Sequence, residues 1–177
     1  VHDHVGIDFQ ADAFHVGMDE VYSITREDDP RTRGKDPALL VAMVVNLLHG
    51  YVVGERGCEM MMWQDTLAGW HQGATIRRAV DLIPQDVVIC DWHYERADPT
   101  PAYFALKGLN VVTCPWTNPK TASQQLQDML RFRAQSSSPM KPRFQGMMQT
   151  VWSDVGSFLR DVAGHQKSED YKKNEKT

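Results

Sequence analysis

A repeated unit constrains the fold of this chain more than any other feature of its sequence. The unit is a short run rich in β-branched and apolar residues, then a polar or aromatic cluster, then a segment with helical spacing. The five runs are Ala13–Gly17, Glu59–Trp63, Asp86–Asp91, Asn110–Cys114 and Phe144–Trp152. Most are largely apolar rather than strictly alternating, which is typical of strands buried on both faces in a parallel sheet.

Helices with recognisable ends are predicted between the runs. Asp36 fits an N-cap with Pro37 at the first helical position, and the helix over Ala38–Leu48 is expected to stop at Gly50. The other predicted helices are Pro101–Lys107, Thr121–Arg133 and a last one from a Ser153 or Asp154 cap through Ala163. Strands that alternate with helices form βαβ units, whose right-handed crossovers require a parallel sheet.

Two architectures share this pattern, the doubly wound open sheet and the eight-stranded α/β barrel. The glycine-rich phosphate loops that often accompany the open sheet, GxGxxG and GxxxxGK[ST], do not occur in the sequence. The chain has 177 residues, whereas a complete barrel needs about 250. A barrel reading therefore implies that part of the barrel lies outside this chain.

Composition narrows the class of partner. The chain is 42% hydrophobic and 24% charged, an ordinary globular composition, and its net charge of −4 without a basic cluster argues against nucleic acid. The longest apolar stretch, Leu39–Leu48, is interrupted by Asn46 and is shorter than the roughly 20 residues that span a bilayer. Three cysteines without a CxxC pair indicate neither a disulfide framework nor a structural zinc site. No targeting signal is visible, so localisation stays open.

Carboxylates and tryptophans follow the predicted strands. The five strand-end clusters are Asp19-Glu20, Trp63-Gln64-Asp65, Asp91-Trp92-His93-Tyr94-Glu95, Trp116-Thr117-Asn118 and Trp152-Ser153-Asp154, and they hold four of the five tryptophans. Because the carboxyl ends of parallel strands form the ligand-binding face of α/β folds, these side chains are expected to converge. Indole rings against the apolar faces of sugars, with carboxylates bonded to hydroxyls, are typical of a carbohydrate pocket.

Some of these residues have a purely structural alternative. Asp65 and Asp154 each fit a helix cap or turn as well as a ligand contact, and His15 fits a hydrogen-bonded histidine inside a strand. The pair Asp19-Glu20 is different, because two adjacent carboxylates repel each other and favour the protonated form of one of them. A protonated carboxyl group suits a general acid.

Three motifs together resemble family 20 glycoside hydrolases, the β-N-acetylhexosaminidases. Phe14 to Val21, with the sequence FHVGMDEV, resembles the H-x-G-x-D-E signature that ends the fourth barrel strand of this family. Met62 to Asp65 resembles its fifth-strand W-Q-[DE] segment, and Val151 to Asp154 its eighth-strand W-x-E segment. The resemblance implies an α/β fold that is a partial (β/α)8 TIM barrel, strands 4 to 8 of the catalytic domain.

The resemblance also implies the organisation of the chain. Residues 1–164 would be the C-terminal portion of a TIM-barrel glycosidase domain, and the polar residues 165–177 a flexible tail. The missing N-terminal half of the barrel, about three βα units of roughly 30 residues each, would restore the expected length. Activity is then expected only when that half is present.

The family's reaction is retaining, substrate-assisted hydrolysis of terminal β-linked N-acetylhexosamine (GlcNAc or GalNAc) through an oxazolinium intermediate, without a metal or other cofactor. The resemblance makes Glu20 the general acid and then base, and makes Asp19 the residue that orients the 2-acetamido group. The implied substrate-binding residues are His15, Trp63, Asp65, Trp92, Tyr94, Trp116, Trp152 and Asp154. The sequence departs from the family at Asp154, which stands where glutamate is usual, and in the segment after Cys114, which lacks the usual Tyr and Asp.

Two other readings are compatible with the sequence. His2-Asp3-His4 has the HxH spacing of a metal-dependent barrel hydrolase, although only His93 follows a later strand as a further histidine. The chain could also be a non-catalytic carbohydrate-binding barrel fragment that keeps the aromatic pocket. Metal analysis separates the first of these readings from the glycosidase, and the effect of a Glu20→Gln substitution on hydrolysis separates the second.

Overall fold

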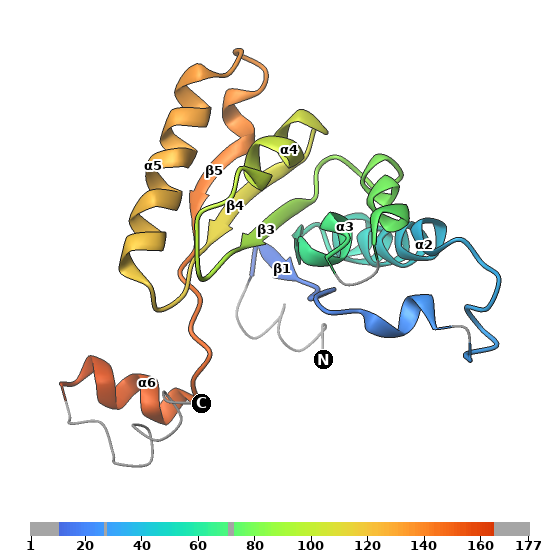
Figure 1. The fold of residues 1–177 in the computed structure, drawn as a ribbon, viewed down its shortest axis with the longest axis horizontal. Coiled ribbons are helices and arrows are strands. Elements are labelled where there is room, and N and C mark those ends of the chain that lie inside the picture. The colour runs from blue at the N-terminus through green and yellow to red at the C-terminus, as the bar shows by residue number, and fades with distance from the viewer. Residues whose placement is uncertain (1–10, 27, 71–72, 165–177) are drawn as a thin grey trace.

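The computed structural model describes residues 11–26, 28–70 and 73–164 (Figure 1). It has an α/β fold with one five-stranded sheet, in which every neighbouring pair is parallel and the strand order follows the chain, β1-β2-β3-β4-β5. The strands are β1 (Ala13–His15), β2 (Glu59–Trp63), β3 (Val88–Trp92), β4 (Asn110–Cys114) and β5 (Phe144–Met147). The predicted fold class and the parallel sheet are confirmed. Residues 165–177, predicted to be a tail, lie outside the described residues.

Two of the five strands have the predicted boundaries. β2 and β4 match the prediction, whereas β3 is Val88–Trp92 instead of Asp86–Asp91, and β1 and β5 end before the predicted Gly17 and Trp152. Gly17 has a φ of 77°, which turns the chain out of the strand. β5 is interrupted by a register shift opposite Val111 and Val112, and beyond Met147 only isolated backbone hydrogen bonds follow β4. An apolar run therefore extends further than the ladder of hydrogen bonds that defines a strand.

The four predicted helices are all present. They are α2 (Pro37–His49), α4 (Thr100–Leu106), α5 (Pro119–Gln135) and α6 (Val155–Val162). The carboxylate of Asp36 accepts the backbone N–H of Ala38 at 2.9 Å, so the predicted cap of α2 is confirmed. Sequence reasoning gave no helix between β2 and β3, where α3 (Asp65–Ala68) and the 3-10 helix η3 (Ala74–Asp81) lie. Short 3-10 helices also occur at η1 (Tyr22–Thr25) and η4 (Lys141–Arg143).

The expectation that the predicted helix over Ala38–Leu48 stops at Gly50 is wrong. Gly50 has right-handed helical dihedral angles, and the helix continues as a π-helical segment, η2 (Gly50–Glu55). A glycine allows the left-handed conformation that ends a helix but does not impose it. Termination comes at Gly57, whose φ is 66° and whose N–H bonds back to the carbonyl of Val53.

α2 and η2 together form one apolar stretch, Pro37–Glu55. Its 19 residues pass a length and composition test for a membrane span, which is weak evidence because core helices pass it too. The face that carries Val41 and Val45 is fully buried, whereas Met43 and Leu47 are exposed. The described residues therefore contain no clear membrane segment.

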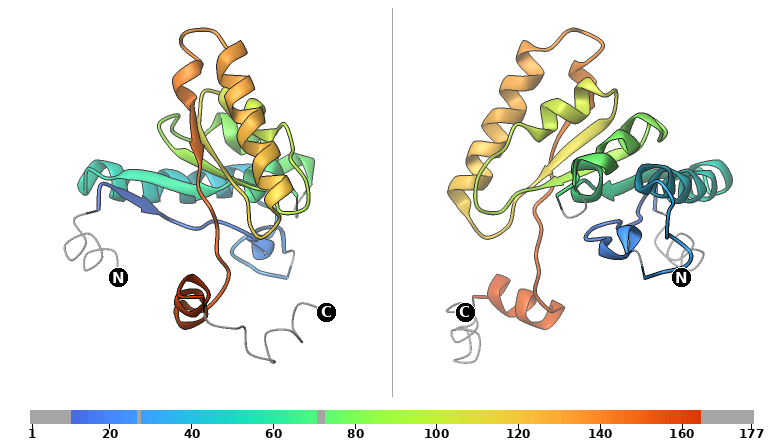
Figure 2. Two further views of the ribbon diagram at one scale, coloured as in Figure 1. Left: turned by 90° about the vertical axis from the view of Figure 1, so that its left-hand side faces the viewer. Right: turned by 45° about the vertical axis from the view of Figure 1, so that its right-hand side comes forward.

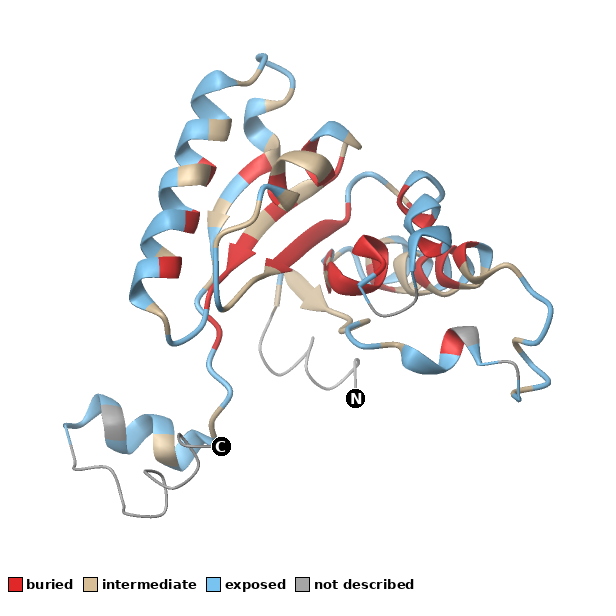
Figure 3. Ribbon diagram, in the orientation of Figure 1, coloured by how far each residue is buried: buried red, intermediate tan, exposed pale blue. Residues whose placement is uncertain are grey.

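The core lies between the sheet and its helices (Figure 3). Successive strand residues point to opposite faces of a sheet, and Met60, Met62, Ile89 and Val111 pack in one buried cluster with residues of α2, η3 and α4. The alternate positions, which include Trp63 and Cys90, point to the other face of the sheet. The carboxyl ends of all five strands meet at the same edge because the sheet is parallel throughout.

The sheet is open at both sides within the described residues, since β1 pairs only with β2 and β5 only with β4. α6 stands apart from the sheet at the end of an extended segment (Figure 2). Its apolar residues Val155, Phe158, Leu159 and Val162 recur at helical spacing and are all exposed. α6 thus presents an apolar face that the rest of the described chain leaves uncovered.

Candidate active site

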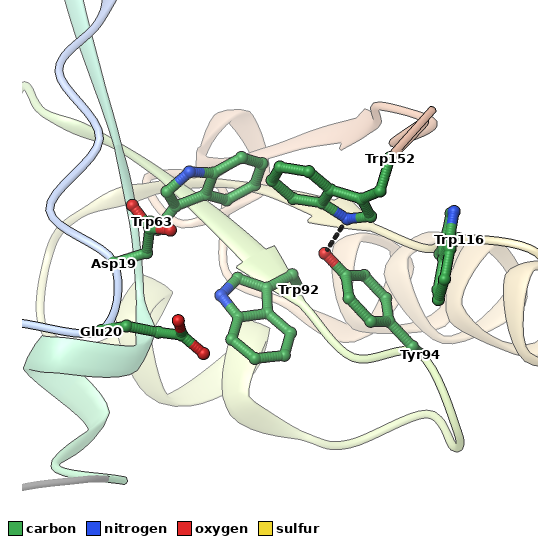
Figure 4. A pocket seen from close by; sticks show the side chains of 7 residues that line it. All are labelled: Asp19, Glu20, Trp63, Trp92, Tyr94, Trp116 and Trp152. Atoms are coloured by element: carbon green, nitrogen blue, oxygen red, sulfur yellow. Dashed lines mark hydrogen bonds between the residues drawn. The ribbon is translucent and has the colours of Figure 1, made fainter. Parts of the chain in front are cut away.

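A cavity of about 340 Å³ lies at the carboxyl ends of the strands. It is lined by Asp19, Glu20, Trp63, Trp92, Tyr94, Trp116 and Trp152 (Figure 4). All seven are predicted site residues. Trp63 and Trp92 are the last residues of β2 and β3, and the other five come from the segments that follow β1, β3, β4 and β5. The cavity is at the lower end of the size range of small-molecule sites, about 300–1,000 Å³.

Aromatic rings form a continuous wall of the cavity. The ring centroids of Trp63 and Trp152 are 6.1 Å apart, those of Trp92 and Tyr94 5.0 Å, and those of Tyr94 and Trp116 5.5 Å. The indole Nε1–H of Trp152 donates to the hydroxyl oxygen of Tyr94 at 2.7 Å. Partial burial of Tyr94 raises its pKa and outweighs the hydrogen bonds that lower it. The phenol therefore stays neutral at physiological pH and can donate a hydrogen bond to a ligand.

The two adjacent carboxylates occupy one side of the cavity. Asp19 and Glu20 are both exposed, and Figure 4 shows Asp19 beside Trp63 and Glu20 extending toward Trp92. The pKa of Tyr22, two residues after Glu20, is raised by desolvation, by a hydrogen bond with Glu20 and by the negative charges of Glu20, Asp65 and Asp19. This side of the cavity is therefore acidic, and it faces the aromatic wall.

His15 lies beneath the wall instead of in the cavity. Its ring packs against Trp63 with centroids 4.4 Å apart, and its Nδ1 accepts the backbone N–H of Gly17 at 3.0 Å. Both contacts agree with the structural alternative for His15, a hydrogen-bonded histidine of the strand, although His15 is the last residue of β1 and does not lie in the strand interior. His15 supports the position of Trp63 and does not line the cavity.

Two further predicted binding residues do not line the cavity. Asp65 is fully buried at the start of α3, where its Oδ2 accepts the backbone N–H of Glu20 at 2.7 Å and its Oδ1 the indole Nε1–H of Trp92 at 3.3 Å. Asp154 accepts the hydroxyl and the backbone N–H of Ser157 at 2.6 and 2.8 Å, and these bonds lower its pKa. Asp154 thus caps α6. The side chains of Asp65 and Asp154 both bond to other parts of the protein and do not line the cavity.

Sequence reasoning missed the part played by Gln64. Its side chain is fully buried, its Nε2 donates to the carbonyl of Trp92 at 2.8 Å, and its Oε1 accepts the N–H of the same residue at 3.0 Å. The amide thereby extends the pairing of β2 with β3 past the end of β2. A glutamine directly after a strand tryptophan was the available signal, but nothing local indicates where its amide points.

A second hollow of about 420 Å³ adjoins the first. It shares Trp92 and Tyr94 with the candidate site and is also lined by Trp70, His93, Glu95 and Arg96. Trp70 meets Trp92 edge-on at 4.8 Å. Trp92 and Tyr94 therefore line both cavities.

The residues around His93 form a buried polar network. Its Nε2 is 2.7 Å from the hydroxyl oxygen of Thr100, which in turn donates to Asp91 at 2.9 Å. Asp91 is fully buried, and this burial raises its pKa although His93 and Thr100 act in the opposite direction. The Nε2 atom of His93 is therefore bonded to another residue of the protein, Thr100.

No group of three or more His, Cys, Asp or Glu side chains is placed to hold a metal ion within residues 11–26, 28–70 and 73–164. The HxH pair of the alternative reading, His2 and His4, lies outside these ranges. The metal-dependent hydrolase therefore has no support from the described part of the chain.

No protein-family model matches this chain, and no curated protein matches it at a significant level. The function of the site has to be argued from the residues in the cavity and from their geometry.

Proposed function

We propose that this chain carries the greater part of the active site of a retaining β-N-acetylhexosaminidase. One observation carries the proposal: two adjacent carboxylates share a cavity of about 340 Å³ with four tryptophans and a tyrosine. Indole and phenol rings bind the apolar faces of pyranose rings, and a cavity of this size suits a monosaccharide unit better than a polymer. The residues are also those that the family 20 resemblance selects, with Asp65, Asp154 and His15 in supporting positions.

The arrangement of the two carboxylates favours substrate-assisted chemistry. Most glycosidases place two carboxylates on opposite sides of the scissile bond, about 5–5.5 Å apart for retention. Asp19 and Glu20 both enter the cavity from the same side (Figure 4). Among the residues that the structure describes, Asp19 and Glu20 are the only carboxylates that line the cavity. A nucleophile supplied by the substrate removes the need for a carboxylate on the opposite side.

The first step of the proposed reaction breaks the glycosidic bond. Glu20 donates its proton to the leaving oxygen while the carbonyl oxygen of the 2-acetamido group attacks the anomeric carbon, which gives an oxazolinium ion and the free alcohol. Asp19 accepts the acetamido N–H and stabilises the positive charge that develops on this group. The indole rings of Trp63 and Trp152 enclose the acetamido group and exclude water from it.

The second step regenerates the enzyme. Glu20, now ionised, removes a proton from a water molecule whose oxygen attacks the anomeric carbon, and the bond to the acetamido oxygen breaks. Two inversions at the same carbon give overall retention. Glu20 ends the cycle protonated and Asp19 ends it unchanged, so no metal or other cofactor is required.

We also propose that the sheet is part of a (β/α)8 barrel. A doubly wound sheet reverses its strand order at a switch point, whereas the order here runs β1 to β5 without reversal. Both edges of the sheet are open, and α6 carries an uncovered apolar face. Three further βα units would close the sheet between β5 and β1 and would cover α6.

The decisive experiment is hydrolysis of 4-nitrophenyl N-acetyl-β-glucosaminide and the corresponding galactosaminide. The chain is assayed alone and with three preceding βα units, and we expect turnover only in the second case. Glu20→Gln should lower kcat by roughly 10³ and Asp19→Asn by roughly 10². Glu59→Gln, at the opposite end of β2, is the matched control and should leave the rate unchanged. A 4-nitrophenyl β-glucoside, which lacks the acetamido group, should not be hydrolysed.

The same variants distinguish an enzyme from a carbohydrate-binding fragment. Tryptophan fluorescence reports binding of N-acetylglucosamine because four indoles line the cavity. An enzyme keeps this binding in the Glu20→Gln variant and loses hydrolysis. Binding without hydrolysis in the wild-type protein, with and without the preceding units, would refute the catalytic proposal and leave the binding function.

A further inference from the structure

The loop that carries the two carboxylates has an unusual backbone. Met18 and Glu20 have φ values of 70° and 51°, and Gly17, just before them, has 77°. Glycine adopts this region without strain, whereas the Cβ atom of any other residue there comes too close to the following carbonyl oxygen. Such a conformation persists only where surrounding contacts fix it.

Contacts from one short segment hold this loop in place. The carbonyl of Gly17 accepts the backbone N–H of Trp63 at 2.9 Å, and the carbonyl of Met18 accepts the hydroxyl of Thr66 at 2.8 Å. The backbone N–H of Glu20 donates to the carboxylate of Asp65 at 2.7 Å. The end of β2 and the first turn of α3 thus bind the loop at three successive points.

Asp65 differs from the other contacts in charge and burial. Its side chain is fully buried although a carboxylate is costly to remove from water, so it needs strong partners. A charge-assisted bond to a backbone N–H is about twice as strong as a neutral one, and the second oxygen receives the indole N–H of Trp92. One carboxylate therefore fixes the backbone of Glu20 and the ring of Trp92, and Figure 4 shows the side chain of Glu20 extending toward that ring.

We propose that Asp65 is a positioning residue, which holds Glu20 in the left-handed conformation that directs its side chain into the cavity. Its kinetic consequence rests on the glycosidase function proposed above. A misplacement of about 1 Å between an acid and its substrate can lower a rate roughly 10²-fold. Asp65 would then control the rate without touching the substrate.

The positioning role can be measured without any activity. In the wild-type protein, a scalar coupling through the hydrogen bond should connect the Glu20 ¹⁵N nucleus with the carboxyl ¹³C of Asp65. Asp65→Asn leaves one oxygen for two donors, so the Glu20 amide should exchange with solvent at least about tenfold faster. Asp81→Asn, the same chemical change on the surface helix η3, is the control and should not alter this exchange.

A rescue experiment sharpens the test. Trp92→Phe removes the indole N–H that competes for the remaining oxygen, so in the Asp65→Asn background it should return Glu20 amide exchange to within about threefold of the wild-type rate. The absence of a coupling between Glu20 and Asp65 in the wild-type protein would overturn the proposal. So would unchanged amide exchange in a folded Asp65→Asn protein.

The kinetic arm uses the closed barrel and the 4-nitrophenyl substrate. Asp65→Asn should lower kcat about 10²-fold and change KM less than about threefold, because the substrate contacts remain while the acid is displaced. If the wild-type protein shows the coupling but no hydrolysis, the glycosidase function fails and the positioning stands. If Glu20→Gln is inactive and Asp65→Asn keeps the wild-type kcat, the positioning role fails and the function stands.

Discussion

The buried amide of Gln64 allows a quantitative test of the site's architecture. Gln64→Met keeps the length and approximate volume of the side chain but removes both partners of the Trp92 backbone. A buried polar group that loses its hydrogen-bond partner destabilises a protein by about 1–3 kcal/mol, and two groups are affected. The buried apolar side chain of Met offsets part of this destabilisation, so we expect Gln64→Met to lower the free energy of unfolding by about 2–4 kcal/mol.

Urea unfolding followed by circular dichroism measures the change, with the m-value checked for two-state behaviour. Gln127→Met is the matched control, because Gln127 is exposed on α5 and its amide is only 3.4 Å from a serine hydroxyl. We expect the control to lie within about 0.5 kcal/mol of the wild type. A loss in Gln64→Met no larger than that of the control would refute the reasoning that Gln64 satisfies the Trp92 backbone.

Two further changes test the electrostatics and the aromatic wall. Burial raises the pKa of Asp91 in the folded protein, whereas in the unfolded chain it has the ordinary aspartate value of about 3.9. As the pH rises above that value, the unfolded chain loses this proton while the folded protein keeps it, so the folded protein becomes less stable. Asp91→Asn removes this loss and keeps an acceptor for Thr100. The difference in unfolding free energy, variant minus wild type, should therefore increase between pH 3 and pH 7. A difference that is independent of pH would contradict a raised pKa of Asp91. Tyr94→Phe removes the acceptor of the Trp152 indole N–H, a bond of about 1 kcal/mol. KM for the N-acetylhexosaminide should therefore rise about fivefold, and the free energy of unfolding should fall by no more than about 1 kcal/mol. An unchanged KM would mean that this bond does not position Trp152.

Local features made much of the fold predictable. Apolar runs at Glu59–Trp63 and Asn110–Cys114 coincide with strands, and Asp36 with Pro37 marks the start of a helix, because short-range sterics and capping bonds decide these features. The predicted boundaries were wrong where contacts with distant segments determine where a helix or strand ends. Gly50 continues a helix that sequence alone would end there, and the regular ladder between β5 and β4 ends at Met147 although the apolar run continues.

Neighbouring residues in the candidate site show where local reasoning ends. Trp63, Gln64 and Asp65 look like one binding motif, yet only Trp63 lines the cavity. The chain leaves the strand at Gln64 and enters α3 at Asp65, so the three side chains diverge toward the cavity, the Trp92 backbone and the Glu20 amide. Which direction each takes depends on partners 28 and 45 residues away along the chain.

The sequence by itself determined which elements form and which residue types gather at the ends of the strands. Hydrophobic periodicity and parallel pairing require only short-range patterns and right-handed crossovers, so the convergence of tryptophans and carboxylates could be predicted. The tertiary structure alone decided which of these side chains face the cavity and which hold others in place. Backbone N–H and carbonyl groups at the ends of distant segments need hydrogen-bond partners. Gln64 and Asp65 lie where their side chains supply these partners, and only the tertiary structure brings the two together.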